Sequence, residues 1–403
     1  MTDAEVVVVG GGIAGASAAY HLARHGRRVT LLERAEVAAG ASGVNAGQID
    51  SIGWGDAPDL QAHLTAGSQE LFETVQLELG EDIEFRRSGA LQVIHTAEQL
   101  EFERTRVSAL RARGHRVELL TIREARSLEP ELDPALLGAM YSPLRSQADP
   151  VKATRALARL AERGGARVQT GHDVTAITPR PAGGYEIRTS RGTVVAGALV
   201  LAAGAWCSRL GAMLDLDVPI VPVRGQMWAT APVPPSLFQT MSSAESALAW
   251  HRDRGGAPPD RTIRDGVRVT RHLYGRQRRN GEIVFGGDRE QAGWSTTPDP
   301  AGIAVNRAHA IEALPFLAGL PVARTWAGLM PFSLDGRPLI GRIPSRADLW
   351  IVSGLASSGF GRGPMAGKLL AAALHTGTPA PVLAEADPAR CVRELAASRE
   401  GGR

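Results

Sequence analysis

The first 34 residues contain the feature that most constrains the fold of this chain. Residues 6–9 are four valines in a row, an apolar run that is typical of a strand buried on both faces. The pattern G-x-G-x-x-G follows at once, and the next residues predict a helix and a second strand that ends at Glu33. Glycines at these spacings permit a tight turn, close approach of a pyrophosphate and close packing of helix on strand, and the helix N-terminus attracts the phosphates. The segment therefore predicts a β-α-β unit that binds a dinucleotide, with Glu33 as acceptor for a ribose hydroxyl.

Composition and charge narrow the class of protein. The chain has 403 residues and is 44% hydrophobic, so it can bury a large core and form two or three domains. Its 45 Lys+Arg and 42 Asp+Glu residues give a net charge of only +3, and arginine is spread along the whole chain, which argues against a nucleic-acid partner. Cys207 and Cys391 form no metal-binding pair, so we expect no metal site. The chain begins without a basic region and has no apolar run long enough for a membrane span, and we expect a cytoplasmic protein.

The remaining patterns predict an α/β fold with two domains. The N-terminal position of the dinucleotide unit favours FAD over NAD. A buried strand that ends at Ala203 and Gly204 adds a segment suited to pass close under a cofactor. The middle of the chain instead alternates like antiparallel strands, around a stretch rich in proline and glycine at 231–266 that we expect to form loops. We therefore predict a Rossmann-type FAD-binding domain with an inserted α+β substrate domain built on an antiparallel sheet. The predicted FAD-binding domain comprises residues 1–85, 140–215 and 325–380, the substrate-binding domain 86–139 and 216–324, and the C-terminal tail 381–403.

Eight stretches of the chain, taken in order, resemble one enzyme family. They are VVVGGGIAGASAAYHLARHGRRVTLLER, GASGVNAGQ, GHDVTAI, LVLAAGAW, VPVRGQM, LYGRQRRNGEIVFGG, RTWAGLMPFSLDGRPLIG and SGLASSGFGRGPMAGK. With them the chain is similar to the FAD-dependent amino-acid and amine oxidoreductases of the D-amino acid oxidase type, which include glycine oxidase and monomeric sarcosine oxidase. The resemblance covers nearly all of the chain. It is specific for the superfamily and does not define a substrate.

The resemblance implies which residues surround the FAD. By this likeness the loop that contains Asp335 and Gly336 and the next glycine-rich loop lie at the flavin ring. The second loop ends at a helix N-terminus, where backbone N–H groups of residues 359–361 stabilise negative charge on the reduced flavin. Relatives with covalent flavin carry a cysteine in the loop that here holds Met330, so we expect FAD to be bound without a covalent bond. The predicted cofactor-binding residues are Gly10, Gly12, Ile13, Ala14, Gly15, Glu33, Arg34, Ser42, Asn45, Ala46, Gly47, Gln48, Val174, Ala203, Gly204, Trp206, Gly328, Met330, Ser358, Gly359, Phe360 and Gly361.

The residues that would bind the substrate depart from the family's pattern. Glycine-oxidase-like relatives carry an arginine in the place of Met330 and another, which binds the substrate carboxylate, in the place of Ser357. Neither residue can form the bidentate salt bridge that arginine gives a carboxylate. Tyr274 aligns with a tyrosine that lies over the substrate in relatives, and the two-residue period of a strand puts His272 and Arg276 on the same face. We hypothesise that Arg276 supplies the anion contact, with a solvent-facing Arg276 as the alternative.

The reaction implied by the resemblance is oxidation of a C–N bond in a small amino acid or amine. A hydride passes from the C–H next to the nitrogen to flavin N5, and the imine that results is hydrolysed by water. This step depends on alignment more than on a strong acid or base. The candidate catalytic residues are Tyr274, Arg276, His272 and Gln48, and a purely structural role is the alternative for His272. Sarcosine-oxidase-like relatives use a lysine beside the flavin to activate oxygen, whereas Lys152 and Lys368 here fall in predicted helices away from that position. Either another cation therefore activates oxygen, or the enzyme is a dehydrogenase that passes electrons to another acceptor.

Two other functions remain open at this point. One is a 2-hydroxy-acid oxidase or dehydrogenase with the same fold. The other is the FAD-binding subunit of a multi-chain amine dehydrogenase, which would need a partner subunit. The sequence also leaves open whether the chain forms a homo-oligomer. A flavin monooxygenase ranks below these, because the stretch SGLASSGFGRG lacks the aspartate of the Gly-Asp-Ala segment that those enzymes carry.

Overall fold

Two eight-stranded sheets organise the chain in the computed structural model, which describes residues 3–50, 52, 58–252, 263–264, 267–268 and 272–395. The first sheet has a parallel centre. Its parallel strands are, in order, β21 (Leu349–Ser353), β11 (Gly192–Leu201), β1 (Ala4–Val9), β2 (Val29–Leu32) and β8 (Arg167–Gln169). Antiparallel strands extend it, namely β20 (Leu339–Arg342) beside β21, and β10 (Tyr185–Thr189) and β9 (Val174–Pro179) beyond β11. The β-α-β unit predicted at the N-terminus is confirmed.

Both faces of β1 are buried, as its run of valines predicts. Val6 and Val8 belong to a core shared with a layer of helices, α1 (Ile13–Arg24), α3 (Pro58–Leu79), α6 (Pro150–Arg163) and α10 (Gly359–Thr376). Val7 and Val9 face a second core that includes the β9–β10 hairpin and α7 (Cys207–Ala212). Helix α6 begins directly after Asp149, whose side chain accepts a hydrogen bond from Lys152 N (2.8 Å). None of the helices described in the structure is both long and apolar enough to cross a membrane.

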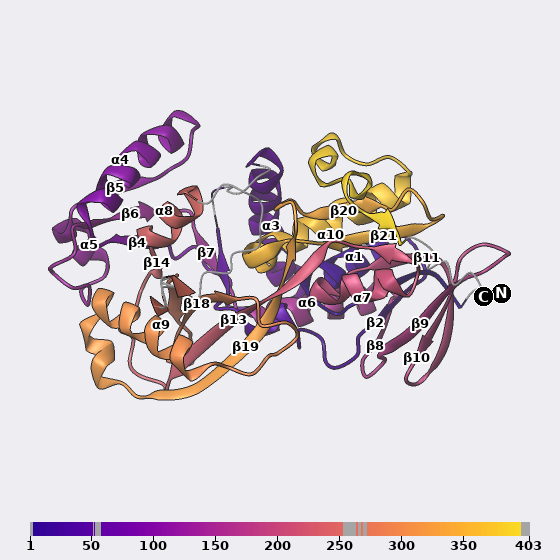
Figure 1. The fold of residues 1–403 in the computed structure, drawn as a ribbon, viewed down its shortest axis with the longest axis horizontal. Helices are drawn as coiled ribbons and strands as arrows, with labels where there is room; N and C mark the ends of the chain where they lie inside the picture. Colours follow the sequence, from indigo (N-terminus) through magenta and orange to yellow (C-terminus); the bar gives the residue numbers. More distant parts are fainter. Residues whose placement is uncertain are drawn as a thin grey trace, which may run out of the picture.

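The second sheet is antiparallel except for one pair. Its strands, in order, are β19 (Val322–Ser333), β13 (Ile220–Thr230), β18 (Ile283–Glu290), β17 (Tyr274–Gln277), β14 (Thr240–Ser243), β4 (Ala90–Ile94), β6 (Gly138–Ser142) and β5 (Glu118–Leu120); only β14 and β4 run parallel. Helices α5 (Ile122–Leu128) and α9 (Pro300–Ala313) contribute to the core on one face, around Trp228 and Phe285. Figure 1 shows this sheet and its helices at one end of the molecule and the first sheet at the other. The predicted α/β fold with an antiparallel second sheet is confirmed.

Several segments differ in detail from the expectations. The stretch at 231–266, expected to form loops, does so at residues 231–239, but β14 and α8 (Ala244–Arg252) follow, so the expectation is wrong for residues 240–252. β14 reads Thr-Met-Ser-Ser, and it is a strand because it pairs with β17 and β4 on its two sides.

The proposed domain boundaries at 139/140 and 324/325 fall inside β6 and β19, which both belong to the second sheet. They remain a proposal.

The described part of the predicted tail packs onto the fold. It forms η4 (Pro381–Ala386), η5 (Pro388–Arg390) and β22 (Arg393–Glu394), and β22 pairs with β12 (Leu216–Asp217). Leu383 and Ala386 are buried in the core beneath α10 and α3. Residues 396–403 lie outside the described residues.

Candidate functional site

One large cavity lies where the two sheets meet. Its volume is about 1300 Å³, and its walls come from the β1–α1 turn, the end of β2, the loop before α10 and the strands β13, β17, β18 and β19. Pockets for ordinary small molecules measure roughly 300–1,000 Å³. This cavity therefore has room for a ligand of dinucleotide size and a small second molecule beside it.

The β1–α1 turn needs glycine where the chain has it. Gly10 has φ +119°, and a Cβ atom there would lie 2.5 Å from the carbonyl oxygen of Ala202. A Cβ atom on Gly15 would lie 2.0 Å from the carbonyl oxygen of Gly10, so α1 packs directly onto its own turn. As a result the N-terminus of α1 opens into the cavity, where an anionic phosphate would meet the positive end of the helix dipole.

Glu33 stands at the end of β2 with its carboxylate fixed. Its two oxygens accept hydrogen bonds from Gly11 N (2.7 Å) and Ala35 N (2.9 Å). Beside it the guanidinium of Arg34 stacks over the ring of Trp206, with Cζ 3.9 Å from the ring centroid. All three side chains, together with Val174, line this end of the cavity. Fixed acceptors next to a flat apolar wall suit a ribose and its adenine.

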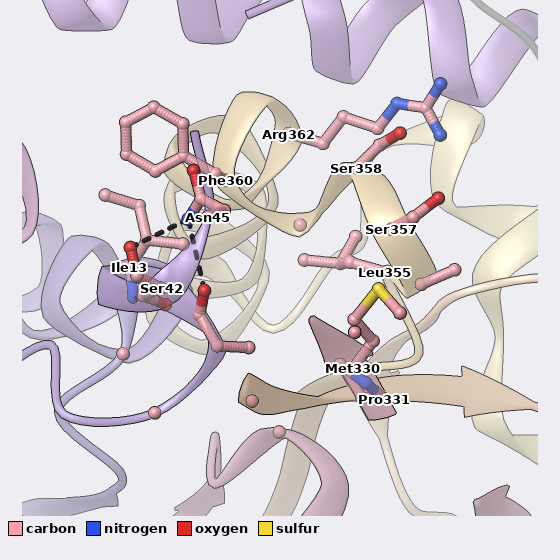
Figure 2. A pocket seen from close by; sticks show the side chains of 18 of the residues that line it. Ile13, Ser42, Asn45, Met330, Pro331, Leu355, Ser357, Ser358, Phe360 and Arg362 are labelled. Carbon is pink, nitrogen blue, oxygen red and sulfur yellow. Dashed lines mark hydrogen bonds between the residues drawn. The ribbon is translucent and has the colours of Figure 1, made fainter. Parts of the chain in front are cut away.

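The opposite end of the cavity is lined by loop main chain together with larger side chains such as Phe360 and Leu355 (Figure 2). The side chain of Asn45 folds back on α2 (Ala41–Val44), because Nδ2 donates to the carbonyl oxygen of Ser42 (2.9 Å) and Oδ1 accepts from Gly47 N (2.7 Å), as Figure 2 shows for the first of these. Gln48 donates from Nε2 to the carbonyl oxygen of Met241 in β14 (3.0 Å), which ties this loop to the second sheet. The N-terminus of α10 faces the same space through Gly359 and Gly361.

Most of the predicted site residues meet in this cavity. Those that line it are Gly10, Gly12, Ile13, Ala14, Glu33, Arg34, Ser42, Asn45, Gln48, Val174, Ala203, Gly204, Trp206, His272, Tyr274, Gly328, Met330, Ser358, Gly359, Phe360 and Gly361. Gly15, Ala46 and Gly47 stand just behind the wall, where a Cβ atom on Gly47 would lie 2.0 Å from the carbonyl oxygen of Ala148. The roles assigned to these residues remain predictions.

The structure contradicts the predicted role of Arg276. Its side chain is 1% exposed and lies outside the cavity. Nε donates to the carbonyl oxygen of Ala46, Nη1 to Oε1 of Gln147 (2.8 Å) and Nη2 to the carbonyl oxygen of Ala148 (3.0 Å). Burial lowers the pKa of Arg276 to about 10. Arg276 is therefore neither solvent-facing nor an anion site: it holds the loop at Ala46 from behind.

Tyr274 does face the cavity, and its phenol stays protonated. Burial raises its pKa to about 12, although the positive charge of Arg289 and a backbone hydrogen bond to Ala46 act in the opposite direction. Its hydroxyl oxygen lies 3.3 Å from the sulfur of Met227. A neutral phenol can donate a hydrogen bond, and it is no general base near neutral pH.

Arg289 is one of several cavity residues that the sequence did not predict; Arg106, Arg145 and Arg362 are others. Arg289 lies on β18, lines the cavity and donates from Nη2 to Oγ of Ser357 (3.2 Å). Its neighbours in the sequence, Asp288 and Glu290, make the segment look like the charged, solvated end of a strand. Only the position of β18 between β13 and β17 shows that Arg289 faces inward.

Neither lysine of the chain belongs to the cavity. Lys152 Nζ pairs with Glu84 Oε1 (2.8 Å) at the surface, and Lys368 lies along α10.

Cys207, one of the two cysteines, is fully buried, which raises the pKa of its thiol to about 12. Among the described residues, no group of three His, Cys, Asp or Glu side chains is arranged to hold a metal ion.

Residues 5–373 of the chain match the protein family DAO, described as FAD dependent oxidoreductase. The chain belongs to this family. Within it, the mitochondrial dimethylglycine dehydrogenase of Mus musculus is 29% identical over 405 residues, which cover 96% of this chain and 44% of that enzyme. The chain thus spans less than half the length of that relative. The glycine oxidase of Bacillus licheniformis is 28% identical over 381 residues, with 91% of this chain and 92% of that one covered.

The fold is shared with solved members of the same group. The glycine oxidase from Geobacillus kaustophilus superposes with a TM-score of 0.84 at 26% sequence identity, over 96% of this chain and 99% of that chain. The resemblance drawn from the eight sequence stretches is therefore confirmed, and so is FAD as the cofactor.

The cavity of this DAO-family protein fits FAD on its own geometry. The pyrophosphate fits the turn at Gly10 and Gly12, which lines the cavity, and the ribose and adenine fit the wall at Glu33 and Val174. The flavin ring fits the end of the cavity beside the N-terminus of α10, whose positive dipole end favours electron density on the ring.

Proposed function

We propose that this chain oxidises a C–N bond of a small amino acid or amine to an imine, which water then hydrolyses. The observation that supports this most is the continuity of the cavity from the predicted flavin end to Tyr274 and Arg289, which leaves a place for a small molecule against the ring. Relatives named for oxidation of glycine and dimethylglycine point in the same direction. When bound, FAD supplies the two-electron acceptor.

The protein's own contribution is to position the substrate and exclude water. Tyr274 is neutral and half-buried, so it can donate a hydrogen bond to the substrate without competing for its proton. A neutral amine needs no further base, provided that its C–H bond is held at near-attack distance. We propose that His272 and Gln48, which both line the cavity, shape its wall. Gln48 is fixed there because its side chain donates a hydrogen bond to the second sheet.

Anaerobic reduction of the bound flavin tests this proposal directly. Purified holoenzyme would be mixed with D- and L-amino acids, N-methyl amino acids, free amines and 2-hydroxy acids, and the visible flavin absorbance would be followed. Bleaching by amines or amino acids supports C–N oxidation. Bleaching by 2-hydroxy acids alone would replace it with the alternative reaction of the same fold.

Electron acceptor, assembly and location are part of the proposal. Admission of air to the bleached enzyme separates an oxidase from a dehydrogenase. Because neither lysine lies in the cavity, we propose that the acceptor is either oxygen activated by another cation or a different electron acceptor. Size-exclusion chromatography of the active protein tests whether it works as one chain, a homo-oligomer or with a partner subunit. The cytoplasmic location predicted from the sequence is tested by cell fractionation.

A further inference from the structure

The part of the cavity where relatives were expected to place two arginines holds two uncharged residues here. Met330 lies on β19, and Ser357 lies in η3 (Ala356–Ser358) just before α10; Figure 2 shows both side chains on the same side of the pocket. A thioether and a hydroxyl cannot neutralise a carboxylate. A substrate with a carboxylate would therefore need a cation from another wall.

Arg289 supplies a cation at this place from the opposite wall. It reaches Ser357 across the cavity, with Nη2 donating to Oγ at 3.2 Å. The side chains of its two acidic neighbours in the sequence point to the other face of the sheet, since successive side chains of a strand point to opposite faces. Asp288 accepts a hydrogen bond from Gln226 (2.6 Å), and Glu290 pairs with Arg224, each with its cross-strand neighbour on β13.

The strands beside Arg289 carry glycines at the positions that adjoin it. Gly225 on β13 lies directly opposite Arg289, and Gly328 on β19 lies directly opposite Gly225. Both glycines line the cavity. A Cβ atom on Gly225 would lie 3.0 Å from the terminal methyl of Met330, and one on Gly328 would lie 2.2 Å from a methyl of Val44. The two glycines therefore leave room for the uncharged side chains of Met330 and Val44 to pack over the sheet beside Arg289.

Tyr274 completes this corner of the cavity. It lies on β17, the other neighbour of β18, and it pairs with Gly286 three residues before Arg289. Burial has the largest effect on the pKa of the Tyr274 phenol and raises it, and the positive charge of Arg289, which lines the same cavity, acts to lower it. The two side chains thus face the same space, one as a cation with a planar fork of donors and the other as a neutral donor.

We propose that Arg289, oriented by the hydroxyl of Ser357, binds the carboxylate of the substrate from the second sheet. The substrate class is then an amino acid, with or without N-substituents, and not a simple amine. This inference rests on the proposed function for the reaction, and it assigns Arg289 as the binding residue and Ser357 as a positioning residue. The planar guanidinium of an arginine matches the two oxygens of a carboxylate, and the hydrogen bond to Ser357 orients it in the cavity.

The first test is binding of carboxylates that cannot be oxidised. Acetate and propionate, and as neutral counterparts acetamide and propionamide, would be titrated into the holoenzyme while the flavin absorbance is followed. We expect Arg289→Met to weaken carboxylate binding about 10- to 100-fold, the range for a lost hydrogen bond to a charged group. Amide binding should change less than about threefold, and Arg289→Lys should fall between the two because it keeps the charge without the fork. Arg342→Met, on the exposed end of β20, is the matched control.

A relocated arginine gives the second test. The double variant Arg289→Met, Ser357→Arg returns a guanidinium to the cavity from the other wall, and we expect it to recover carboxylate binding at least tenfold over Arg289→Met. Ser357→Ala should weaken carboxylate binding and raise KM for a carboxylated substrate while kcat stays within about twofold. Retention of FAD and an unchanged unfolding midpoint would show that each variant is folded.

The outcomes separate this inference from the proposed reaction. If Arg289→Met binds acetate as the wild type does, or if wild type binds acetamide as well as acetate, the carboxylate site is not at Arg289. If amines without a carboxylate bleach the flavin as well as amino acids do, C–N oxidation stands and the assigned substrate class falls. If acetate binding depends on Arg289 and no amine or amino acid bleaches the flavin, the carboxylate site stands and the proposed reaction falls.

Discussion

At the scale of single residues, the buried Glu129 leads us to predict a stability that depends on pH. Its side chain is fully buried at the end of α5, and one oxygen accepts hydrogen bonds from Phe238 N and Gln239 N, both at 2.9 Å. Burial raises its pKa to about 7, and the two backbone hydrogen bonds oppose this shift. We predict that Glu129→Gln gives a protein more stable than wild type at pH 8, by about 1–3 kcal/mol, and similar to it near pH 4.5.

The sign follows from where the proton is bound. The folded pKa is above the unfolded value, so the stabilising effect is complete below about pH 4.5 and is lost as the pH rises to about 7. The glutamine keeps an oxygen for the two backbone N–H groups and carries no charge, so it does not have this loss. Urea unfolding at pH 5 and pH 8 measures the difference, with Glu162→Gln on the exposed face of α6 as control. Equal stability of variant and wild type at pH 8 would contradict the prediction.

Two arginines show what the sequence could and could not predict about the site. The strand period correctly places Tyr274 and Arg276 on one face, but only the tertiary structure shows that the cavity ends at Tyr274 and that Arg276 lies beneath the loop at Ala46. Arg289 sits between two acids in the sequence, a pattern that also fits a solvated strand end. The dinucleotide end was predictable because its glycines and Glu33 are fixed by local geometry within one β-α-β unit.

At the scale of elements, the close packing of α1 against α10 positions the cofactor end of the cavity. Gly367 in α10 approaches α1 so closely that a Cβ atom would lie 2.5 Å from the carbonyl oxygen of Ala14 and 2.7 Å from the N of Ala18. Ser17 Oγ donates to the carbonyl oxygen of Pro364 (2.6 Å) at the same contact. Both helices begin at the cavity wall, so a change in their separation also moves the N–H groups that face the cofactor.

We predict that Gly367→Ala destabilises the protein and weakens FAD binding. Alanine favours a helix over glycine by about 1 kcal/mol. The methyl group, however, meets backbone atoms that no rotamer change can move, and such overpacking costs typically about 1–3 kcal/mol. The net loss should appear as a lower urea midpoint and a higher Kd for FAD. Gly319→Ala, where a Cβ atom meets open space, is the control. An unchanged Kd for FAD would show that the helix contact does not set the cofactor site.

The elements themselves were predictable to different degrees. The strand at β1 and the helix α6 carry local signals, a β-branched run and an Asp-Pro start. β14 carries none, since its four residues are mostly polar and its partners β17 and β4 include a strand about 150 residues away in the sequence. A segment of this kind becomes a strand because it is buried between two other strands. The local sequence pattern gives no sign of that burial.

At the scale of the whole molecule, FAD would contact both sheets at once. The first sheet supplies the dinucleotide end of the cavity and the second supplies the wall at β13, β17, β18 and β19, while each sheet has a hydrophobic core of its own. A ligand bound only by the folded state stabilises it by about 2.7 kcal/mol when present at 100 times its Kd. We predict that removal of FAD lowers the unfolding midpoint and increases amide hydrogen exchange in both sheets, including β18 and β19.

ADP separates the two halves of this effect because it carries the adenine, ribose and pyrophosphate without the flavin. We expect ADP added to the FAD-free protein to protect amides in β1, β2 and the start of α1, and to leave β18 and β19 as unprotected as before. FAD should protect both sets. Hydrogen exchange followed by mass spectrometry measures this segment by segment. If FAD protected only the first sheet, the flavin would lie away from the wall that carries Arg289, and the carboxylate site proposed there would lose its position next to the reacting ring.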